Sequence, residues 1–463
     1  MEQFDIIILG AGPAGYVAAI RAAQLKKKVC VIERNEVGGT CLNTGCIPTK
    51  AIIASANLFA TIKRASEFGI SVKDAIANFN SIKEREKRVV ETGVNGIKSL
   101  FKKHGITLKY GKARFKEPFV IENHQRNGYN ELLSSDRIII ATGSYPAVIL
   151  NTHTDNEYIF DSDSILEIDS LPVSMTIIGG GSVGCEFAHI FNSFGVKVSI
   201  IELMSHLIPF ADEDISNVLE REFKKRGINI YLEKEVKGIS RGERQVKVVL
   251  SDGFEIESER LLMAAGRRFN TSELGIEDIG IKTGRRGEIL VNDKMESSIS
   301  GIYAAGDVVG RVMLAYVASK EGIAAVENAS GIERKMDYSV IPLTIFTEPE
   351  IGCVGLRERD AVDKGIKVKT GSFQLRSLGR AHASHELSGM VKVVSEYDTD
   401  KILGVHIIGA HASEIVHEAT VAIKMGMKSR ELEETIHAHP VFSEGVMEGA
   451  ADVHGMAIHK IRD

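Results

Sequence analysis

Two segments of the chain share one pattern, and this repeat restricts the fold more than any other feature. Each segment has a β-branched apolar run, a glycine-rich turn, a helical stretch, a second apolar run and then a glutamate. The first spans Ile6 to Glu33, and the second spans Thr176 to Glu202. Strands that alternate with crossover helices predict parallel sheets. We therefore expect an α/β protein with two Rossmann-like dinucleotide-binding domains.

The glycines of both turns have the spacing of a dinucleotide-binding fingerprint. They are Gly10, Gly12 and Gly15 in the first turn, and Gly179, Gly181 and Gly184 in the second. Such glycines allow a tight turn, close approach of the backbone to a pyrophosphate, and close packing of helix on strand. Glu33 and Glu202 follow at one shared spacing, where a carboxylate can bind a ribose. The alternative, glycine-rich turns without a ligand, is disfavoured by this strand–turn–helix context.

Glu202 also predicts which nucleotide the second turn binds. Its carboxylate would repel a 2′-phosphate, and residues 203–207 include no arginine that could neutralise one. NAD is therefore expected there rather than NADP. The glycines of the first turn do not identify its ligand, which depends on the rest of the chain.

Cys41 and Cys46 are a candidate redox pair. On an ideal helix, five steps of about 1.5 Å would separate them by roughly 7.5 Å along the axis. This exceeds the usual Cα separation of about 4.4–6.8 Å in a disulfide. If they bond, the backbone between them must bend, and Asn43 and Gly45 are residue types that tolerate a turn.

The other cysteines and the composition exclude several classes of protein. Five cysteines in 463 residues do not suggest a secreted disulfide framework, and Cys30, Cys185 and Cys353 are predicted core residues. A net charge of −5 without a long basic run argues against nucleic-acid binding. Apolar stretches such as residues 6–9 and 137–140 are far shorter than the roughly 20 residues of a membrane span.

Two further expectations concern location and metals. The N-terminus leads directly into a strand without a recognisable signal or transit segment, so a cytoplasmic protein is expected. His382, His385 and His411 lack metal-ligand spacing, so no metal is predicted.

The segment Gly38–Lys50 resembles the redox-active disulfide of the pyridine nucleotide-disulfide oxidoreductases. Its Cys-Leu-Asn-x-Gly-Cys-Ile-Pro form is most similar to the dihydrolipoamide dehydrogenase branch of that family. The resemblance covers nearly the whole chain. Its other segments are Ile140–Ser144, Ala264–Arg268, Gly301–Asp307, Met313–Ala315 and His437–Glu444.

This resemblance implies the domain organisation. At roughly 150 residues per domain, 463 residues suggest about three domains, and mixed strands and helices after about Tyr338 indicate a separate α+β domain. We expect an FAD-binding domain with the redox disulfide at 1–149, an NAD-binding domain at 150–270, a central domain completing the FAD site at 271–340, and a dimerisation domain at 341–463. Helical spacing of Val90, Val94, Ile97 and Phe101 predicts an amphipathic helix in the first of these.

Residue roles are likewise implied by the resemblance. Cys41 would be attacked by the substrate thiolate, and Cys46 would face the flavin. The other implied roles are Lys50 near the flavin and paired with Glu186, His439 as the base, and Glu444 as its orienter. A nearby cation lowers a thiol pKa, and a carboxylate fixes the tautomer of an imidazole. Further implied FAD residues are Gly39, Thr40, Ala113, Thr142, Gly143, Ser144, Asp307 and Ala315; further NAD residues are Val236 and Gly266.

Each of these motifs has a simpler interpretation. Cys41 and Cys46 could be inert thiols, and His439 could be an ordinary surface or capping histidine before a first-turn Pro440. The chain also departs from the family pattern, mostly where substrate identity is concerned. The departures are Thr49 for a common Ser, Tyr316-Val317 for a common His-Lys, and Leu378-Gly379-Arg380 for an Asn-containing segment.

The implied activity is oxidation of dihydrolipoyl groups with reduction of NAD+ to NADH, in a homodimer that serves a 2-oxo acid dehydrogenase or glycine cleavage complex. The nearest alternatives are NADPH-dependent enzymes that resemble glutathione or mercuric reductase. Glu202 argues against both, and residues 459–463 lack the vicinal cysteines of the latter. An alternative from another class is a catalytically idle docking subunit, which would have no need of Cys41, Cys46 or Lys50.

Overall fold

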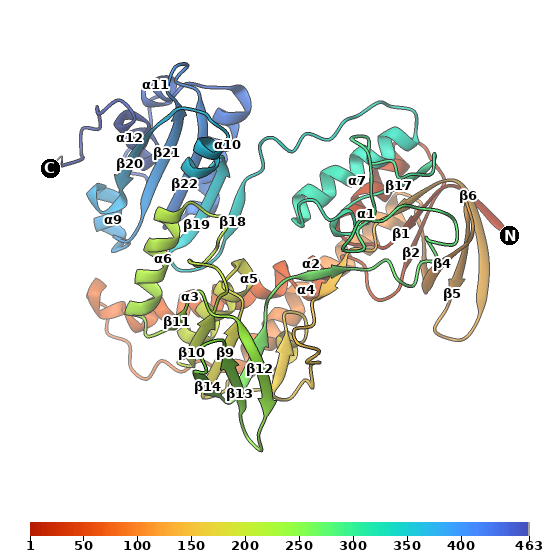
Figure 1. The fold of residues 1–463 in the computed structure, drawn as a ribbon, viewed down its shortest axis with the longest axis horizontal. Helices are drawn as coiled ribbons and strands as arrows, with labels where there is room; N and C mark the ends of the chain where they lie inside the picture. Colours follow the sequence, from red (N-terminus) through yellow and green to blue (C-terminus); the bar gives the residue numbers. More distant parts are fainter. Residues whose placement is uncertain (462–463) are drawn as a thin grey trace.

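The first repeated segment forms the centre of a seven-stranded sheet in this computed structural model, which describes residues 1–461 (Figure 1). Strand β1 (Glu2–Leu9) lies between β2 (Val29–Glu33) and β6 (Asn130–Ile140), and the three are parallel. β17 (Ile302–Ala304) pairs in parallel with β6 although it lies far along the chain. The remaining strands are β3 (Thr107–Tyr110), β4 (Lys112–Glu117) and β5 (Val120–His124).

Three helices cover one face of this sheet. They are α1 (Pro13–Gln24), α4 (Phe79–Lys103) and α7 (Ala315–Ala329), which share a core with Ile6 and Ile8 of β1. Val94, Ile97 and Phe101 of α4 are buried there, which confirms the predicted amphipathic helix. In Figure 1, α7 lies beside α1 although some 300 residues of chain separate them. The opposite face is covered by apolar residues of the segment 274–289 and by Val308 and Val309.

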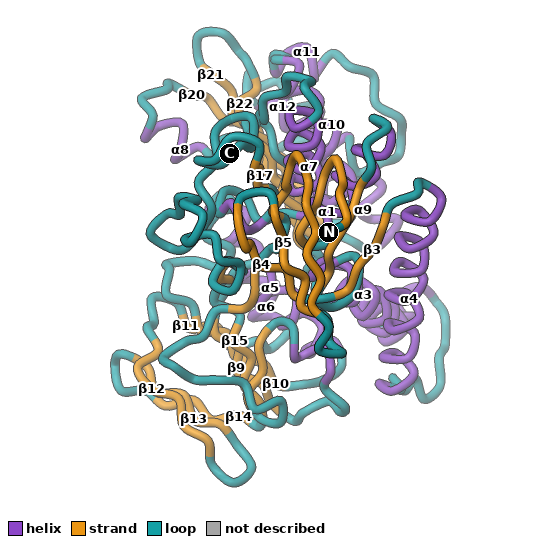
Figure 2. The backbone as a smooth tube through the Cα atoms, turned by 90° about the vertical axis from the view of Figure 1, so that its right-hand side faces the viewer, coloured by secondary structure: helices purple, strands orange, loops and turns teal. Residues whose placement is uncertain are grey.

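The second repeated segment forms the centre of a five-stranded parallel sheet. Here β9 (Ser174–Ile178) lies between β10 (Lys197–Ile201) and β15 (Arg260–Met263), so the second predicted βαβ unit is also confirmed. β8 (Ile159–Asp161) and β11 (Asn229–Tyr231) form the edges. Its helices are α5 (Ser182–Ser193) and α6 (Glu213–Lys225). A projecting antiparallel sheet contains β12 (Val236–Arg241), β13 (Val246–Leu250) and β14 (Glu255–Ser258), as Figure 2 shows.

The C-terminal part of the chain is an antiparallel sheet with helices, as expected for an α+β domain. The strand order is β18 (Leu343–Ile345), β19 (Glu350–Gly355), β22 (Ile402–Gly409), β21 (Met390–Glu396) and β20 (Val368–Gln374). One face packs against α10 (Ala412–Met425) and α12 (Glu444–Asp452). The other face joins the core of the second nucleotide domain through residues such as Ile351 and Met390.

Short elements complete the described chain. β7 (Ser144–Pro146) pairs with β16 (Arg267–Phe269), which joins the segments that leave the two parallel sheets. The remaining short helices are α2 (Gly39–Asn43), α8 (Glu358–Asp363), α9 (Gly379–Ser384) and α11 (Ser429–Glu433), with 3-10 turns at Ala65–Phe68, Ser164–Glu167, Asp307–Val309 and Leu375–Ser377.

One helical stretch, Gly39–Lys63, is long and apolar enough to cross a membrane by length and composition. The criterion is met only as an average over the window, because polar residues divide the stretch into short apolar runs such as residues 51–54, and the helix itself is interrupted between α2 and α3. Within it, α3 (Cys46–Lys63) packs against α4 and α5 of the same chain. Ile52 and Ile53 of α3 are buried in the core of the second nucleotide domain. The helix therefore links the two nucleotide domains.

Candidate active site

A cavity of about 1060 Å³ lies beside the first glycine-rich turn. It collects residues from the first turn, the cysteine segment, the start of α7, helix α5 and strand β18. The predicted site residues that line it are Gly10, Gly12, Glu33, Gly39, Thr40, Cys41, Cys46, Lys50, Ala113, Thr142, Gly143, Ser144, Glu186, Asp307 and Ala315. Fifteen positions spread over three hundred residues thus meet around one space.

The first turn can only be built from glycine at two of its positions. Gly10 has a φ of +99°, and a Cβ there would lie 2.4 Å from the carbonyl oxygen of Ala141. A Cβ on Gly15 would lie 1.9 Å from the carbonyl oxygen of Gly10. The second turn repeats this geometry, because a Cβ on Gly184 would lie 1.9 Å from the oxygen of Gly179. Both turns therefore hold strand and helix as close as a dinucleotide site requires.

Glu33 and Glu202 are buried and hold their turns in the same way. Glu33 accepts hydrogen bonds from the backbone N–H groups of Ala11, at 2.7 Å, and Asn35. Glu202 accepts from Gly180, at 2.6 Å, and from Met204. Burial raises the pKa of Glu33, against the effect of these N–H donors. Each carboxylate oxygen keeps a further lone pair for a ribose hydroxyl.

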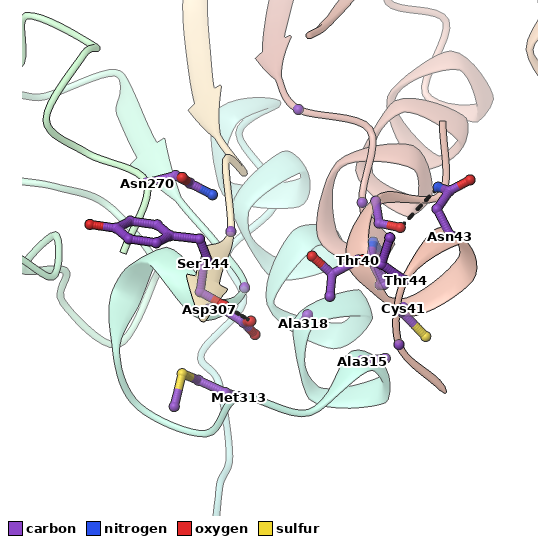
Figure 3. A pocket seen from close by; sticks show the side chains of 18 of the residues that line it. Thr40, Cys41, Asn43, Thr44, Ser144, Asn270, Asp307, Met313, Ala315 and Ala318 are labelled. Atoms are coloured by element: carbon purple, nitrogen blue, oxygen red, sulfur yellow. Dashed lines mark hydrogen bonds between the residues drawn. The ribbon is translucent and has the colours of Figure 1, made fainter. Parts of the chain in front are cut away.

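The backbone between Cys41 and Cys46 bends, as a direct interaction of the two sulfurs requires. Helix α2 ends at Asn43, and α3 begins at Cys46. The bend lies at Thr44 and Gly45, so of the two expected turn residues Gly45 lies in the bend and Asn43 is the last residue of α2. The side chain of Asn43 instead donates to the carbonyl oxygens of Val37 and Gly39, which secures the end of α2; Figure 3 shows one hydrogen bond from Asn43.

Both cysteines are free thiols in this structure, and their side chains hydrogen-bond to each other. This hydrogen bond from Cys41 lowers the pKa of Cys46 to about 7, although burial opposes the shift, and the charge of Lys50 adds to it. The same contact, together with burial, raises the pKa of Cys41. Near neutral pH the pair thus carries its negative charge on Cys46.

Lys50 and Glu186 meet beside the cysteines. The Nζ of Lys50 lies 2.7 Å from Oε2 and 2.9 Å from Oε1 of Glu186. The backbone N–H of Phe346 donates to the same Oε1, and its ring lies 4.8 Å from the Lys50 Nζ. Phe346 belongs to no motif in the sequence, which is why sequence reasoning missed it.

Ser144 and Asp307 meet on another side of the cavity, as Figure 3 shows. Ser144 Oγ donates to Asp307 Oδ2 at 2.6 Å, and Arg267 Nε donates to Ser144 Oγ at 2.7 Å. Arg267 lines the cavity and lies in the segment Ala264–Arg268, which shares the family resemblance, but the sequence alone did not mark it as a site residue.

Comparison with known proteins identifies the family. Residues 4–322 match the model for pyridine nucleotide-disulphide oxidoreductases, and residues 341–450 match the dimerisation domain of the same family. The chain belongs to the pyridine nucleotide-disulphide oxidoreductase family. The predicted resemblance and the α/β fold class are thereby confirmed.

Relatives within this oxidoreductase family align over nearly their whole lengths. The dihydrolipoyl dehydrogenase of Chlamydia pneumoniae is 38% identical, over 97% of this chain and 96% of its own. That of Thermus scotoductus is 39% identical, over 99% of both. The solved structure of LpdA from Mycobacterium tuberculosis superimposes with a TM-score of 0.90 at 29% identity, over 97% of this chain and 99% of LpdA.

FAD and NAD are the cofactors of this oxidoreductase. The first site fits FAD, since a glycine turn and Glu33 lie at one part of the cavity and the cysteine pair at another. The second turn lies outside the cavity, but Ser182 and Val183 of its helix α5 line it. Val236 is buried in the core beside β13, and Gly266 has a φ of +104° in the segment between β15 and β16.

The oxidoreductase chain does not bring His439 to the cavity. The His439 side chain is 74% exposed, on the C-terminal domain, and its Nδ1 lies 2.8 Å from Oε1 of Glu444. Glu444 also accepts the backbone N–H of Val441. Although burial opposes it, these donors lower the pKa of Glu444. The predicted His–Glu pair is therefore formed, with Nε2 of the imidazole directed away from its carboxylate.

Proposed function

We propose that this chain oxidises dihydrolipoyl groups to the lipoyl disulfide and reduces NAD+ to NADH. The observation that carries the proposal is the Cys41–Cys46 pair, whose thiols perturb each other's pKa in a cavity that the Lys50–Glu186 pair also lines. Its relatives with this enzyme name align over nearly the full chain.

The proposed reaction begins with the oxidised Cys41–Cys46 disulfide. One substrate thiolate attacks Cys41, the sulfur–sulfur bond breaks, and Cys46 leaves as a thiolate. The second substrate thiolate then attacks the first substrate sulfur, which releases Cys41 and completes the lipoyl disulfide. A leaving thiol of low pKa leaves faster, so a pKa of about 7 suits Cys46 to this role. Bound FAD supplies the two-electron acceptor that links the reduced dithiol to NAD+.

We infer that Lys50 stabilises negative charge beside Cys46 and that Glu186 holds Lys50 in place. Ser144 and Asp307 would bind the FAD ribityl region, together with the remaining first-site residues that line the cavity. Glu202 and the second glycine turn would bind NAD. These roles rest on the geometry above and on the family pattern.

The active unit in this proposal is a homodimer. His439 is exposed and lies outside the cavity of its own chain, and it lies within the match to the family's dimerisation domain. The His439–Glu444 pair of one subunit would serve the cysteine pair of the other. We further propose domain boundaries near residues 149, 270 and 340, and a 2-oxo acid dehydrogenase or glycine cleavage complex as the source of lipoyl groups.

Steady-state assays test this function. Purified enzyme should reduce NAD+ with dihydrolipoamide and should not reduce glutathione disulfide with NADPH at a comparable kcat/KM. Equal or better activity in the second assay would contradict the proposal and favour a glutathione reductase-like enzyme. A flavin-loaded protein inactive in both assays would favour the idle docking subunit.

A further inference from the structure

The segment that carries His439 makes few backbone hydrogen bonds to the rest of its domain. Residues 434–443 connect α11 to α12. Within residues 1–461, no backbone–backbone hydrogen bond involves residues 436–440. Ile436 is 97% exposed and His439 is also mostly exposed. Side chains must therefore determine where this segment lies.

Phe442 is buried in the C-terminal core and attaches the segment on the far side of His439, and His437 attaches it on the near side. The His437 side chain is only 6% exposed, and its Nε2 lies 2.7 Å from Oε1 of Glu418 on α10. Its Nδ1 lies 2.8 Å from the carbonyl oxygen of Thr435. The imidazole thus connects its own segment to a neighbouring helix.

Helix α10 is a rigid support for this contact. Its Val416, Ala419 and Ala422 are buried in the core between α10 and the C-terminal sheet. Glu418 projects from the part of α10 that faces the His439 segment. The hydrogen bond to Glu418 therefore fixes the His437 side chain relative to the whole C-terminal domain.

Both partners of His437 are acceptors. The carbonyl oxygen of Thr435 and the carboxylate of Glu418 occupy the two ring nitrogens of His437, so neither nitrogen is left to face a substrate. His439 differs, because only its Nδ1 is engaged and Nε2 keeps its lone pair for a substrate proton. The two histidines of His437-Ala438-His439 therefore have different chemistry.

We propose that His437 and Glu418 are positioning residues that clamp the His439 segment to α10 and so present His439 to the substrate dithiol. This inference rests on the proposed function, in which His439 is the base. Misplacement of a catalytic group by about 1 Å can cost about 100-fold in rate. Loss of the clamp should therefore slow proton removal from the dithiol and leave nucleotide binding unaffected.

The test compares the two half-reactions of FAD-loaded enzyme by stopped flow. Glu418→Ala and His437→Ala should slow reduction by dihydrolipoamide about 10-fold to 100-fold, while reduction by NADH stays at the wild-type rate. Glu418→Gln keeps an acceptor oxygen and should restore most of the dithiol rate. The double variant Glu418→Ala/His437→Ala should be no slower than the slower single variant, because both remove one contact. Glu414→Ala, at an exposed glutamate on the same helix, is the matched control.

Wild-type dithiol rates in both alanine variants would overturn the inference, and so would an equal loss in the NADH half-reaction. Sedimentation should show dimers throughout; a monomeric Glu418→Ala variant would place the residue in the subunit contact instead. Failure of the proposed function gives a different result, since wild-type enzyme would then not oxidise dihydrolipoamide and His439→Gln would change nothing.

Discussion

Lys50 and Glu186 form an ion pair that joins the redox segment to the second nucleotide domain. Lys50 lies one turn into α3, which begins at Cys46, and Glu186 lies one turn into α5, which begins at the second glycine turn. Their carboxylate–ammonium distance of 2.7 Å spans 136 positions of sequence. The pair thus relates the cysteines to the helix that would bind NAD.

Removing Glu186 should destabilise the enzyme. The Glu186 side chain is 6% exposed and that of Lys50 is 31% exposed, so Glu186→Ala would leave Lys50 and the Phe346 N–H without their acceptor. We expect the free energy of unfolding to fall by about 1–3 kcal/mol, measured by chemical denaturation. Glu167→Ala, which removes a largely exposed pair with Lys87, should lower the free energy of unfolding by less than about 1 kcal/mol. An equal loss of unfolding free energy in the two variants would contradict the prediction that the Lys50–Glu186 pair stabilises the fold more than an exposed pair does.

Alkylation of Cys46 in the reduced enzyme should depend on pH with a midpoint near 7. The pKa of Cys46 is lowered to about 7, so its reactive thiolate is present above that pH and is lost as the pH falls through it. Cys41→Ala should raise the midpoint, because the hydrogen bond from Cys41 is the largest cause of the shift. Lys50→Met should raise it less. Rates of iodoacetamide labelling at Cys46, followed by peptide mass spectrometry, give the midpoint in each variant. An unchanged midpoint in Cys41→Ala would contradict the interaction of the Cys41 and Cys46 side chains.

FAD retention should depend on Gly15. Purified enzyme should be yellow with about one FAD per chain, and Gly15→Ala should lose it because the new Cβ would lie 1.9 Å from the oxygen of Gly10. Gly96 of α4 has open space at its Cβ position, so Gly96→Ala should keep its FAD. The ratio of flavin to protein absorbance measures the FAD content of both variants. A Gly15→Ala enzyme that keeps about one FAD per chain would contradict the assignment of the first glycine turn to FAD.

NADH should be strongly preferred over NADPH. A buried Glu202 facing a 2′-phosphate places like charges together, which costs several kcal/mol. Glu202→Ala should lower the ratio of kcat/KM for NADH to kcat/KM for NADPH. Glu257→Ala, at an exposed position of the same domain, should leave this ratio unchanged. Comparable kcat/KM values for NADH and NADPH in wild-type enzyme would contradict this prediction.

His439→Gln should slow reduction by dihydrolipoamide about 100-fold to 10,000-fold, the usual contribution of a general base. Reduction by NADH involves no substrate thiol and should stay within about tenfold of wild type, or about 1.4 kcal/mol. Mixing His439→Gln subunits with Cys41→Ser subunits should restore part of the activity, since a hybrid dimer keeps one intact site. If mixed dimers are shown to form and still have no activity, the proposal that His439 of one subunit serves the cysteine pair of the other would be contradicted.

The sequence alone predicted those features that depend on residues close together in the chain. The two βαβ units, their glycine turns and the glutamates Glu33 and Glu202 all follow from patterns within about thirty residues, because strand, turn and helix formation are local. The buried face of α4 followed from its helical spacing for the same reason. The need for a bend between Cys41 and Cys46 followed from helix geometry, and Gly45 was correctly expected to tolerate it, whereas Asn43 proved to be the last residue of α2.

Only the tertiary structure decided which distant side chains meet. Phe346 joins Glu186 from 160 positions away, and no local pattern marks it. The His437–Glu418 contact and the exposure of His439 likewise depend on how α10, α12 and the C-terminal sheet pack. The same packing decided that the apolar helix α3 lies between two domains of one chain. Such contacts are set by the way sheets and helices dock, and that information is spread over the whole core rather than held in any single segment.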